Sequence, residues 1–419
     1  MKGERMTKRR KRAAAGFLAG LLLCTQTMPV LAEEGQLITS DVLYTIGVVS
    51  YNKDAAEMDM FMDYYRDYIE AGFPVHFVVS DTVTSGEEEN EFIRTMKSMG
   101  AQGIISFYGH DIESTVSVCK EEEMYYVLGS GTLSDEEFDT VKENPWFLGT
   151  VGPEADTEYI AGRDMAKHFA DKGAKSCLLI TGGAGINNFM HLERTRGFLE
   201  GLTEVWGLAL DNIEELASQS EVTPVDTGKA GYSITLCPGY MSTEEGKANL
   251  EAALDRESYD AVLSCMAVDS FMDSFTAKEE AQGSNLMLGI IDCFSEQNFE
   301  LVRKKDRFGN SSIDYVAGKY GSMAGPAFAM LYNAMAGDAD ANSEDGLAVR
   351  LYQGFWTAGS KEEYIELYGY TTGIYENAYS CDDLMKVIRD FNAEADAQSL
   401  KALAEAYSVD EVKERILSR

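Results

Sequence analysis

The chain has 419 residues, with 36 Lys and Arg against 70 Asp and Glu, and a net charge of −34. This negative charge argues against binding to nucleic acids, whose phosphate backbones it would repel. The length predicts two domains, because one hydrophobic core rarely serves more than about 300 residues. The four histidines lie far apart in the sequence and no Cys-x-x-Cys pair occurs, so no metal site is expected.

Residues 1–32 have the pattern of a secretory signal peptide. The basic segment Lys8–Arg12 is followed by an uncharged stretch rich in Ala and Leu, and residues 30–32 precede a predicted cleavage site before Glu33. Two alternatives are an uncleaved N-terminal anchor and lipid attachment at Cys24, although the leucine before this cysteine disfavours lipidation. Cleavage leaves 29 basic and 69 acidic residues, a net charge of about −40.

From residue 42 onward, short apolar runs alternate with amphipathic helical segments. Met58, Phe61, Tyr65 and Ile69 recur at helical spacing, and Gly72 is placed to end that helix. Strands separated by single helices cannot pair as hairpins, so they predict a parallel, doubly wound sheet. The predicted strands of this first cycle are 44–50, 74–80, 103–108, 125–129 and 146–149.

A second cycle of the same pattern begins near Pro153 and predicts a second lobe. Its predicted strands are 176–181, 232–237, 260–265 and 286–291. A strand over 312–316 and a helix over 321–336 are interpreted as the return to the first lobe. The expected fold is α/β, with two doubly wound parallel-sheet lobes. We assign 42–150 plus about 295–345 to lobe 1, 151–294 plus about 346–370 to lobe 2, and 371–419 to a C-terminal helical extension.

The sequence also predicts where two helices begin, a final strand, and the state of the cysteines. The sequences Ser242-Thr-Glu-Glu245 and Ser408-Val-Asp-Glu411 predict capping boxes that begin helices. Residues 348–356 predict a final strand. Cys177 and Cys265 lie inside apolar strand-like runs, and we expect the cysteines to be buried apolar residues rather than disulfide partners.

Enzyme motifs are absent from the sequence. Gly182-Gly-Ala-Gly185 lies between a strand and a helix, but it matches neither the dinucleotide fingerprint nor a P-loop. No Gly-x-Ser-x-Gly elbow or His-Glu-x-x-His helix occurs either. We therefore expect no catalytic residues and no cofactor.

Polar and aromatic side chains follow the carboxyl ends of the predicted strands, where open α/β sheets bind their ligands. Aromatic faces, amides and carboxylates together suit a polyol, which stacks its C–H faces on rings and donates its hydroxyls to oxygen acceptors. For any one of these residues, an ordinary loop or capping role is an alternative. The candidates are Tyr51, Asn52, Tyr108, Ser130, Asn187, Asn188, Phe189, His191, Asp269 and Asp292.

An ordered series of stretches carries a family resemblance. These stretches are Tyr44-Thr-Ile-Gly-Val-Val-Ser, Gly100-Ala-Gln-Gly-Ile-Ile-Ser-Phe, Val151-Gly-Pro-Glu, Tyr259-Asp-Ala-Val-Leu and Leu288-Gly-Ile-Ile-Asp292. Between about residues 42 and 337 the chain resembles the type I periplasmic binding proteins, specifically the ribose- and galactose-type sugar-binding subgroup of ABC transporters. The resemblance implies two lobes joined by three crossovers, a ligand held between them, and delivery to an ABC transporter permease or a membrane sensor.

The resemblance also implies roles for single residues. Asp292 matches the family's ligand-binding aspartate, and Tyr51 and Asn52 fall in its first ligand loop. The family's sugar-gripping arginine aligns here with His191 or its neighbour, and its Asn-Asp pair is reduced to Asp269. These departures keep a nucleoside-binding protein of the same fold as an alternative to a sugar-binding one. A secreted α/β enzyme and a lactose-type repressor are further alternatives, but the catalytic motifs and the DNA-binding segment they need are missing.

Overall fold

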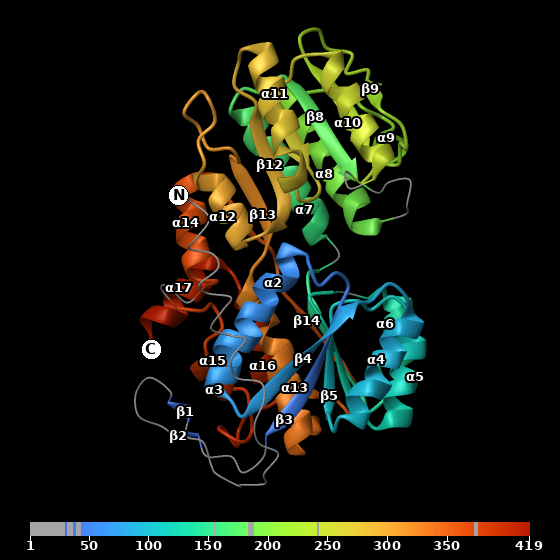
Figure 1. The fold of residues 1–419 in the computed structure, drawn as a ribbon, viewed down its shortest axis with the longest axis vertical. Coiled ribbons are helices and arrows are strands. Elements are labelled where there is room, and N and C mark those ends of the chain that lie inside the picture. Colours follow the sequence, from blue (N-terminus) through green and yellow to red (C-terminus); the bar gives the residue numbers. More distant parts are fainter. Residues whose placement is uncertain are drawn as a thin grey trace, which may run out of the picture.

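The protein folds into two α/β lobes stacked one above the other in the computed structural model (Figure 1). The structure describes residues 30–31, 37–38, 43–131, 133–154, 156–182, 188–240, 243–372 and 376–419. Almost all of the predicted signal peptide, including Cys24, lies outside the described residues. The short strands β1 (Val30–Leu31) and β2 (Leu37–Ile38) pair antiparallel.

The sheet of lobe 1 has the order β14-β7-β6-β5-β3-β4, and every neighbouring pair is parallel. Its central strands bury nearly every side chain, as Ile46, Val48 and Ile105 illustrate, because helices cover both faces. The predicted parallel sheet is thereby confirmed. Its strands are β3 (Tyr44–Ser50), β4 (Val75–Thr82), β5 (Gly103–Ser106), β6 (Tyr125–Gly129), β7 (Phe147–Gly152) and β14 (Val349–Tyr352).

The helices of lobe 1 include the predicted one that ends at Gly72, which contains a π-helical turn. It comprises α2 (Ala56–Asp63), the π-helix η1 (Tyr64–Ile69) and α3 (Glu70–Gly72). Helix α13 (Gly325–Ala336) is buried from Gly325 to Ala334 and packs against β5, β6 and β7. The other helices are α4 (Gly86–Ser98), α5 (Ile112–Glu122), α6 (Asp135–Val141), η4 (Gly321–Ala324) and η5 (Ala339–Asn342).

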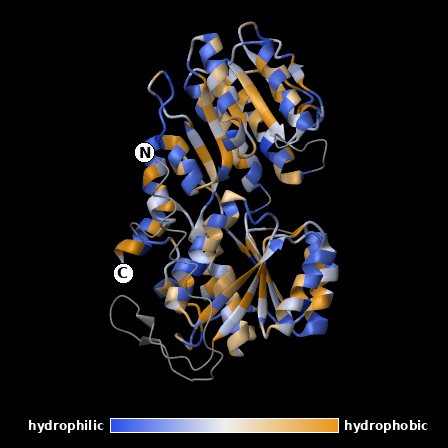
Figure 2. Ribbon diagram, viewed as in Figure 1, coloured by the Kyte–Doolittle hydropathy of each residue, from blue (hydrophilic) through white to orange (hydrophobic). Residues whose placement is uncertain are grey.

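The sheet of lobe 2 has the order β15-β13-β12-β11-β8-β10-β9, with a parallel interior and an antiparallel strand at each edge. Its strands are β8 (Ser176–Gly182), β9 (Thr223–Val225), β10 (Ser233–Pro238), β11 (Ala261–Ser264), β12 (Met287–Cys293), β13 (Tyr315–Lys319) and β15 (Trp356–Ala358). Its helices are α7 (Thr157–Asp171), α8 (Phe189–Trp206), α9 (Ile213–Ala217), α10 (Glu244–Arg256), η3 (Asp269–Phe271), α11 (Met272–Gln282) and α12 (Glu296–Arg303). The central strands of each sheet are rich in apolar residues, whereas the peripheral helices carry both apolar and polar residues (Figure 2).

Two boundary predictions are wrong. Strand β13 pairs with β12, so the return to lobe 1 comes at about residue 320 rather than at 295. The strand predicted at 348–356 is two strands in different sheets, because β14 pairs with β7 and β15 pairs with β13. The three crossovers implied by the resemblance are confirmed after the end of β7, at 320 and at 353–355.

The C-terminal segment is not a separate extension, because it returns to lobe 1. After α14 (Lys361–Gly369), which packs on α12 and β15, helices α15 (Cys381–Met385) and α16 (Ala397–Glu405) pack against α13. The box at Ser408 is confirmed as the start of α17 (Val409–Leu417). The N-cap of α10 is Thr243, and Ser242, the predicted cap, lies outside the described residues. The predicted register there is wrong by one residue.

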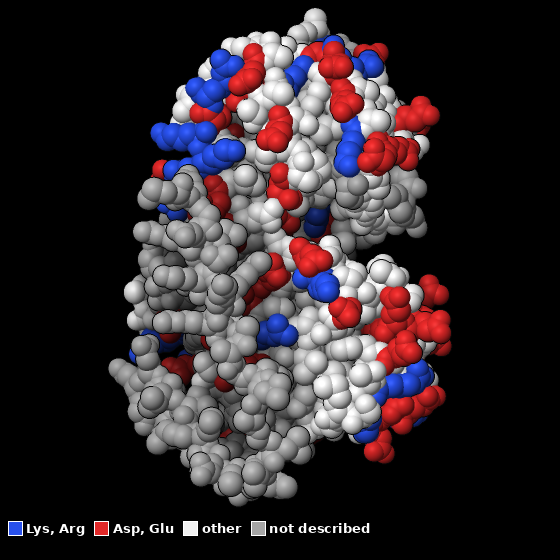
Figure 3. All heavy atoms as spheres, viewed as in Figure 1, with Lys and Arg blue, Asp and Glu red and all other residues white. Residues whose placement is uncertain are grey.

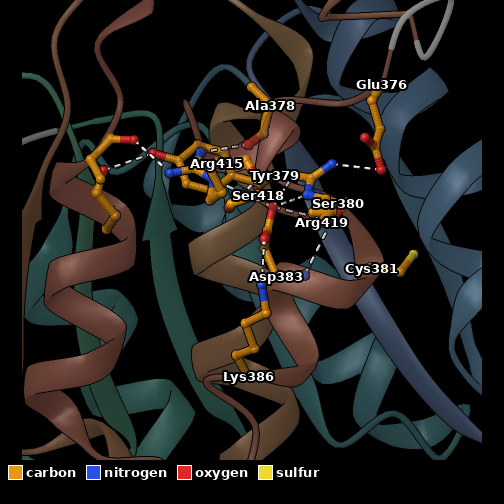
Figure 4. A network of polar contacts seen from close by, with 12 residues as sticks. Glu376, Ala378, Tyr379, Ser380, Cys381, Asp383, Lys386, Arg415, Ser418 and Arg419 are labelled. Carbon is orange, nitrogen blue, oxygen red and sulfur yellow. Dashed lines mark hydrogen bonds and ion pairs between the residues drawn. The ribbon is translucent and has the colours of Figure 1, made fainter. Parts of the chain in front are cut away.

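A buried carboxylate, Asp383, holds the end of the chain in place (Figure 4). Its side chain is fully buried, and Lys386 Nζ lies 3.2 Å from Oδ1. Arg415 Nε lies 3.4 Å from Oδ2, and Arg419 forms an ion pair with the same oxygen. Arg415 in the last turn of α17 and Arg419 beyond that helix thus neutralise a carboxylate next to α13, which ties the tail to the core of lobe 1.

The predicted burial is confirmed for five of the six cysteines in the described residues, and all six are free there. Cys119, Cys177, Cys237, Cys265 and Cys293 are buried, and the sixth is partly buried. In the same part of the chain, no helix is both long and apolar enough to cross a membrane.

Candidate functional site

A deep notch separates the two lobes on one side of the molecule (Figure 3). Strands of both sheets point their carboxyl ends toward the boundary between the lobes (Figure 1). The loops after these strands therefore meet where the lobes face each other, at the place where α/β folds commonly bind ligands.

Tyr51 of lobe 1 and Asp292 of lobe 2 both lie at this boundary. Tyr51 follows β3 in lobe 1, and Asp292 is the second-to-last residue of β12 in lobe 2. Burial, then the carboxylates of Glu57 and Asp292, raise the pKa of the Tyr51 phenol, and Arg194 opposes this effect. Glu57 pairs with Lys319, which is the register partner of Cys293 beside Asp292, and Arg194 Nη1 donates to Ile291 O at 3.5 Å. Charged side chains from both lobes therefore gather at the end of β12, in one cluster with Tyr51.

Asp292 is half-buried, and burial raises the pKa of its carboxyl to about 6. The charges of Glu57 and Asp269 act in the same direction, whereas a hydrogen bond from Asn298 and the charge of Arg194 lower it. Asn298 Nδ2 donates to Asp292 Oδ2 at 2.6 Å and to Cys293 O at 2.9 Å. The carboxylate is thus oriented by a buried amide.

The helix after Asp292 has its own cap, so Asp292 is not needed for that purpose. Ser295 Oγ accepts a hydrogen bond from Asn298 N at 3.2 Å and is the N-cap of α12. In the described part of the chain only Asn298 donates to the Asp292 carboxylate, through Oδ2. Oδ1 is therefore the oxygen left for a ligand hydroxyl.

Arg194 is a central residue that the sequence analysis missed. Its side chain is 9% exposed, and Nε lies 2.5 Å from Glu158 Oε2. Nη1 donates to Cys265 O at 2.7 Å, and the guanidinium lies 5.8 Å from the ring centre of Phe355 in the third crossover. Glu158 Oε1 is buried and accepts no hydrogen bond from the described residues. This ion pair therefore carries one free acceptor at the lobe boundary.

Close packing of α7 on α8 positions Arg194. A Cβ at Gly162 would lie 2.2 Å from Arg194 O, and a Cβ at Gly197 would lie 2.2 Å from Tyr159 O. Only glycine fits at these two contacts. The Ala161-Gly-Arg and Arg196-Gly-Phe sequences were the only local signal for this arrangement, and they do not identify the arginine at 194.

Another ion pair, unlike that of Arg194 and Glu158, joins the two lobes. Lys319 Nζ, at the end of β13, lies 2.9 Å from Glu57 Oε1 in the first turn of α2. The two side chains are 11% and 16% exposed, so the pair is largely removed from water. Neither residue was predicted, because each partner is remote from the other in the sequence.

Comparison with solved structures reveals what this architecture is similar to. No family model and no curated protein matches the chain. A solute-binding protein of an ABC transporter from Actinobacillus succinogenes, with bound D-allose, superposes with a TM-score of 0.55 at 12% identity, over 77% of this chain and 99% of its own. A Bacillus halodurans solute-binding protein with bound myo-inositol gives 0.52 at 15% identity, over 78% and 97%. The arabinose-transporter protein of Shewanella sp. ANA-3, bound to L-arabinofuranose, gives 0.51 at 13% identity, over 79% and 96%.

The chain has the two-lobed fold of the type I periplasmic binding proteins. The fold predicted from the sequence is thereby confirmed. At these identities the similarity extends to the fold alone. The type of ligand therefore depends on the side chains that this chain places at the lobe boundary.

The remaining predicted site residues of lobe 1 differ in burial and in hydrogen bonding. Asn52 is exposed, and its Oδ1 accepts a hydrogen bond from Asp54 N at 3.2 Å, which is a turn role. Tyr108 is half-buried, with its ring 4.6 Å from that of His110. Ser130 has a φ of +57°, and its buried Oγ has no hydrogen-bond partner among the described residues. The Ser130 hydroxyl is thus another buried polar group at a strand end without a hydrogen-bond partner among the described residues.

The candidates of lobe 2 gather around the start of α8. Asn188 caps the helix by accepting from His191 N at 3.1 Å, and its Nδ2 donates to Tyr240 Oη at 3.0 Å. His191 is buried, with its ring 5.4 Å from that of Tyr240, and burial and Arg194 lower its pKa to about 3. Phe189 is 58% exposed.

Two further candidates complete the comparison. Asp269 is exposed at the start of η3, and its charge contributes to raising the pKa of the Asp292 carboxyl. Asn187 lies outside the described residues. Tyr240 is the aromatic residue of this region that the sequence analysis missed, although it follows the buried strand β10 at the same sheet edge.

Proposed function

We propose that this protein is exported and captures a small polyhydroxylated molecule, most simply a sugar, between its two lobes. The observation that supports this proposal best is the cluster at the end of β12. There Glu57 of lobe 1 pairs with Lys319, and Arg194 of lobe 2 donates to Ile291 O, the residue before Asp292. Tyr51 of lobe 1 lies in the same electrostatic environment. A ligand at this cluster is contacted from both lobes at once.

The polar and aromatic groups of the cluster and of the neighbouring strand ends suit hydroxyl groups. Asp292 Oδ1 offers a charged acceptor, and charge-assisted hydrogen bonds are about twice as strong as neutral ones. Glu158 Oε1 and Ser130 Oγ are buried polar atoms without partners, and such atoms are rare unless something else satisfies them. The rings of Tyr51 and Tyr108 provide apolar faces for C–H groups.

The structural relatives agree with this class of ligand. Allose, arabinofuranose and myo-inositol, the molecules bound by those proteins, all carry several hydroxyls on a compact ring. The arginine at 194, held by Glu158 and by a backbone carbonyl, differs from the resemblance-based expectation for this region. We therefore propose the class of ligand and leave the individual sugar to experiment.

We further propose that the protein delivers its ligand to an ABC transporter permease or a membrane sensor and does not transform it. Export follows from the signal-peptide pattern of residues 1–32. Mass spectrometry of the secreted protein should find a mature N-terminus near Glu33. A lipidated Cys24 or an intact N-terminus in the membrane fraction would overturn this part of the proposal.

A thermal-shift screen of the mature chain tests ligand capture directly. A ligand that binds only the folded state stabilises it by about 2.7 kcal/mol at a hundredfold excess over Kd. We expect sugars or inositols to raise the melting temperature, and nucleosides and amino acids to leave it unchanged. A response to nucleosides alone would favour the nucleoside-binding alternative. Turnover of a chromogenic hydrolase substrate, without any stabilising metabolite, would favour an enzyme.

A further inference from the structure

A second hollow, of about 730 Å³, lies between the lobes and is separate from the cleft cluster. Its walls come from α2 and η1 of lobe 1 and from α12 and the end of α14 of lobe 2. Tyr51, Arg194 and Asp292 are not among its lining residues. We call it the acidic groove, because of the carboxylates that line it.

Five carboxylates line the acidic groove on two facing helical segments. Asp59, Asp63 and Asp67 recur every four residues along α2 and η1, and Glu296 and Glu300 are one turn apart on α12. Of these five carboxylates, only Glu300 has an ion-pair partner among the described residues, namely Arg303 at 3.6 Å. Burial, then the charges of Asp67, Asp59 and Glu296, raise the pKa of Asp63. The groove therefore concentrates negative charge without neutralising it.

Asn377 provides an independent sign of a missing ligand. This residue lines the acidic groove and is 3% exposed, and its Oδ1 accepts no hydrogen bond from the described residues. Buried polar atoms are hydrogen-bonded in the great majority of cases, so an unpartnered amide oxygen in the wall of a groove requires explanation. A donor bound in the groove would satisfy it.

The spacing of the carboxylates favours an extended cation over a metal ion. Within the described residues, no group of three or more His, Cys, Asp or Glu side chains is arranged to hold a metal. Asp59 and Asp67 are eight positions apart and are separated by on the order of 10 Å of helix, at about 1.5 Å per residue. The half-buried rings of Tyr68 and Tyr368, also in the groove, offer faces for methylene groups and ammonium ions.

We propose that the acidic groove binds an aliphatic polyamine. Its ammonium groups pair with the carboxylates of the two helices, one ammonium donates to Asn377 Oδ1, and the methylene segments lie against the tyrosine rings. This site is independent of the sugar cleft, and each can fail without the other.

Calorimetric titration with spermidine at about 0.15 M salt tests the proposal. The double variant Asp63→Asn/Glu296→Gln removes one carboxylate from each wall, and it should weaken spermidine binding by about tenfold or more. The matched control, Glu251→Gln/Asp255→Asn, removes the same charge from exposed positions on α10, far from the groove, and should change the affinity less than about twofold. Equal losses in both variants would mean diffuse attraction to an acidic protein and would overturn the proposal.

Two more variants locate the ligand. Asn377→Ala should weaken spermidine binding several-fold while the apo melting temperature stays close to that of the native protein, because the lost oxygen has no partner to abandon. Asp292→Asn should leave spermidine binding unchanged. Loss of spermidine binding in Asp292→Asn would place the polyamine in the cleft, and an unchanged affinity in Asn377→Ala, with the double variant also unaffected, would leave no role for the groove.

Discussion

Lys319 and Glu57 form an ion pair that joins the two lobes beside the second crossover, with Nζ and Oε1 2.9 Å apart. Lys319 ends a strand of lobe 2, and the chain enters lobe 1 at the next residue. The pair therefore fixes the first helix of lobe 1 against the point where the chain changes lobes. Glu57 also contributes to the electrostatic environment of Tyr51 and Asp292, so the hinge and the proposed cleft share one carboxylate.

Glu57→Gln should destabilise the unliganded protein. The substitution leaves the largely buried Lys319 ammonium without its counter-charge, and we expect a loss of about 1–3 kcal/mol in the free energy of unfolding, somewhat below that of fully buried pairs. Urea denaturation measures this loss. As a control, Lys53→Gln breaks an ion pair whose side chains are 49% and 93% exposed, and it should cost almost nothing. Equal effects of the two variants would contradict a special role for the buried pair.

Asp292→Ala should weaken ligand binding without lowering the stability of the unliganded protein. Removal of the charged acceptor leaves ligand hydroxyls unpaired in the closed cleft, at a cost of about 1.5–3 kcal/mol or roughly 10- to 150-fold in affinity. Calorimetric titration with the sugar found in the screen measures this loss. The contrasting variant is Ser295→Ala, which removes the cap of α12 and should lower stability by about 1 kcal/mol with little change in affinity. The opposite pattern would make Asp292 a structural residue.

Ligand affinity should depend on pH through Asp292. Its pKa of about 6 lies above the ordinary value of 3.8, so its carboxyl becomes protonated as the pH falls below about 6. Loss of the charged acceptor should lower the affinity by up to about tenfold per pH unit below that value, and the affinity should level off above it. His191 does not titrate in this window, because its pKa is lowered to about 3. Titrations from about pH 5 to 8 should show a step in the native protein that is absent in Asp292→Asn.

The same shift has the opposite sign for the stability of the unliganded fold. Because the folded state binds this proton more tightly than the unfolded state, ionised Asp292 costs stability above pH 6, and that cost disappears as the pH falls from about 6 to about 4. The difference in unfolding free energy between Asp292→Asn and the native protein should therefore be larger at pH 7 than at pH 4. A constant difference would contradict the raised pKa.

Asp383→Asn should loosen the C-terminal segment. Asp383 is fully buried and pairs with Arg415 and Arg419, whose side chains are 13% and 12% exposed. Loss of this carboxylate leaves two cations near the core, and we expect a decrease of about 3 kcal/mol or more in the free energy of unfolding. Limited proteolysis should then cleave within residues 376–419 first. Asp410→Asn, an exposed substitution in the same segment, serves as the control.

Local features of the sequence determined most of the secondary structure and the general form of the fold. The alternation of apolar runs with helical spacing depends only on residues close together in the chain, and so do the Ser408 capping box and the position of Asp292 at the end of its strand. The predicted return to lobe 1 was placed too early, before β13, because the apolar run from Tyr315 to Lys319 is compatible with a strand of either sheet. Its hydrogen bonds to β12 decide the matter, and no local pattern records them.

The site shows the same division. Asp292 and Tyr51 could be proposed from the sequence alone, because each follows or ends a buried strand. Arg194, Glu57 and Lys319 could not, since a charged residue on a helix or at a strand end is ordinarily exposed to solvent. Lys319 and Glu57 are 262 positions apart, and Arg194 is 71 positions from the carbonyl of Cys265 that it contacts. Only the path of the chain through two lobes brings such partners together, and their burial there makes each charge depend on the other.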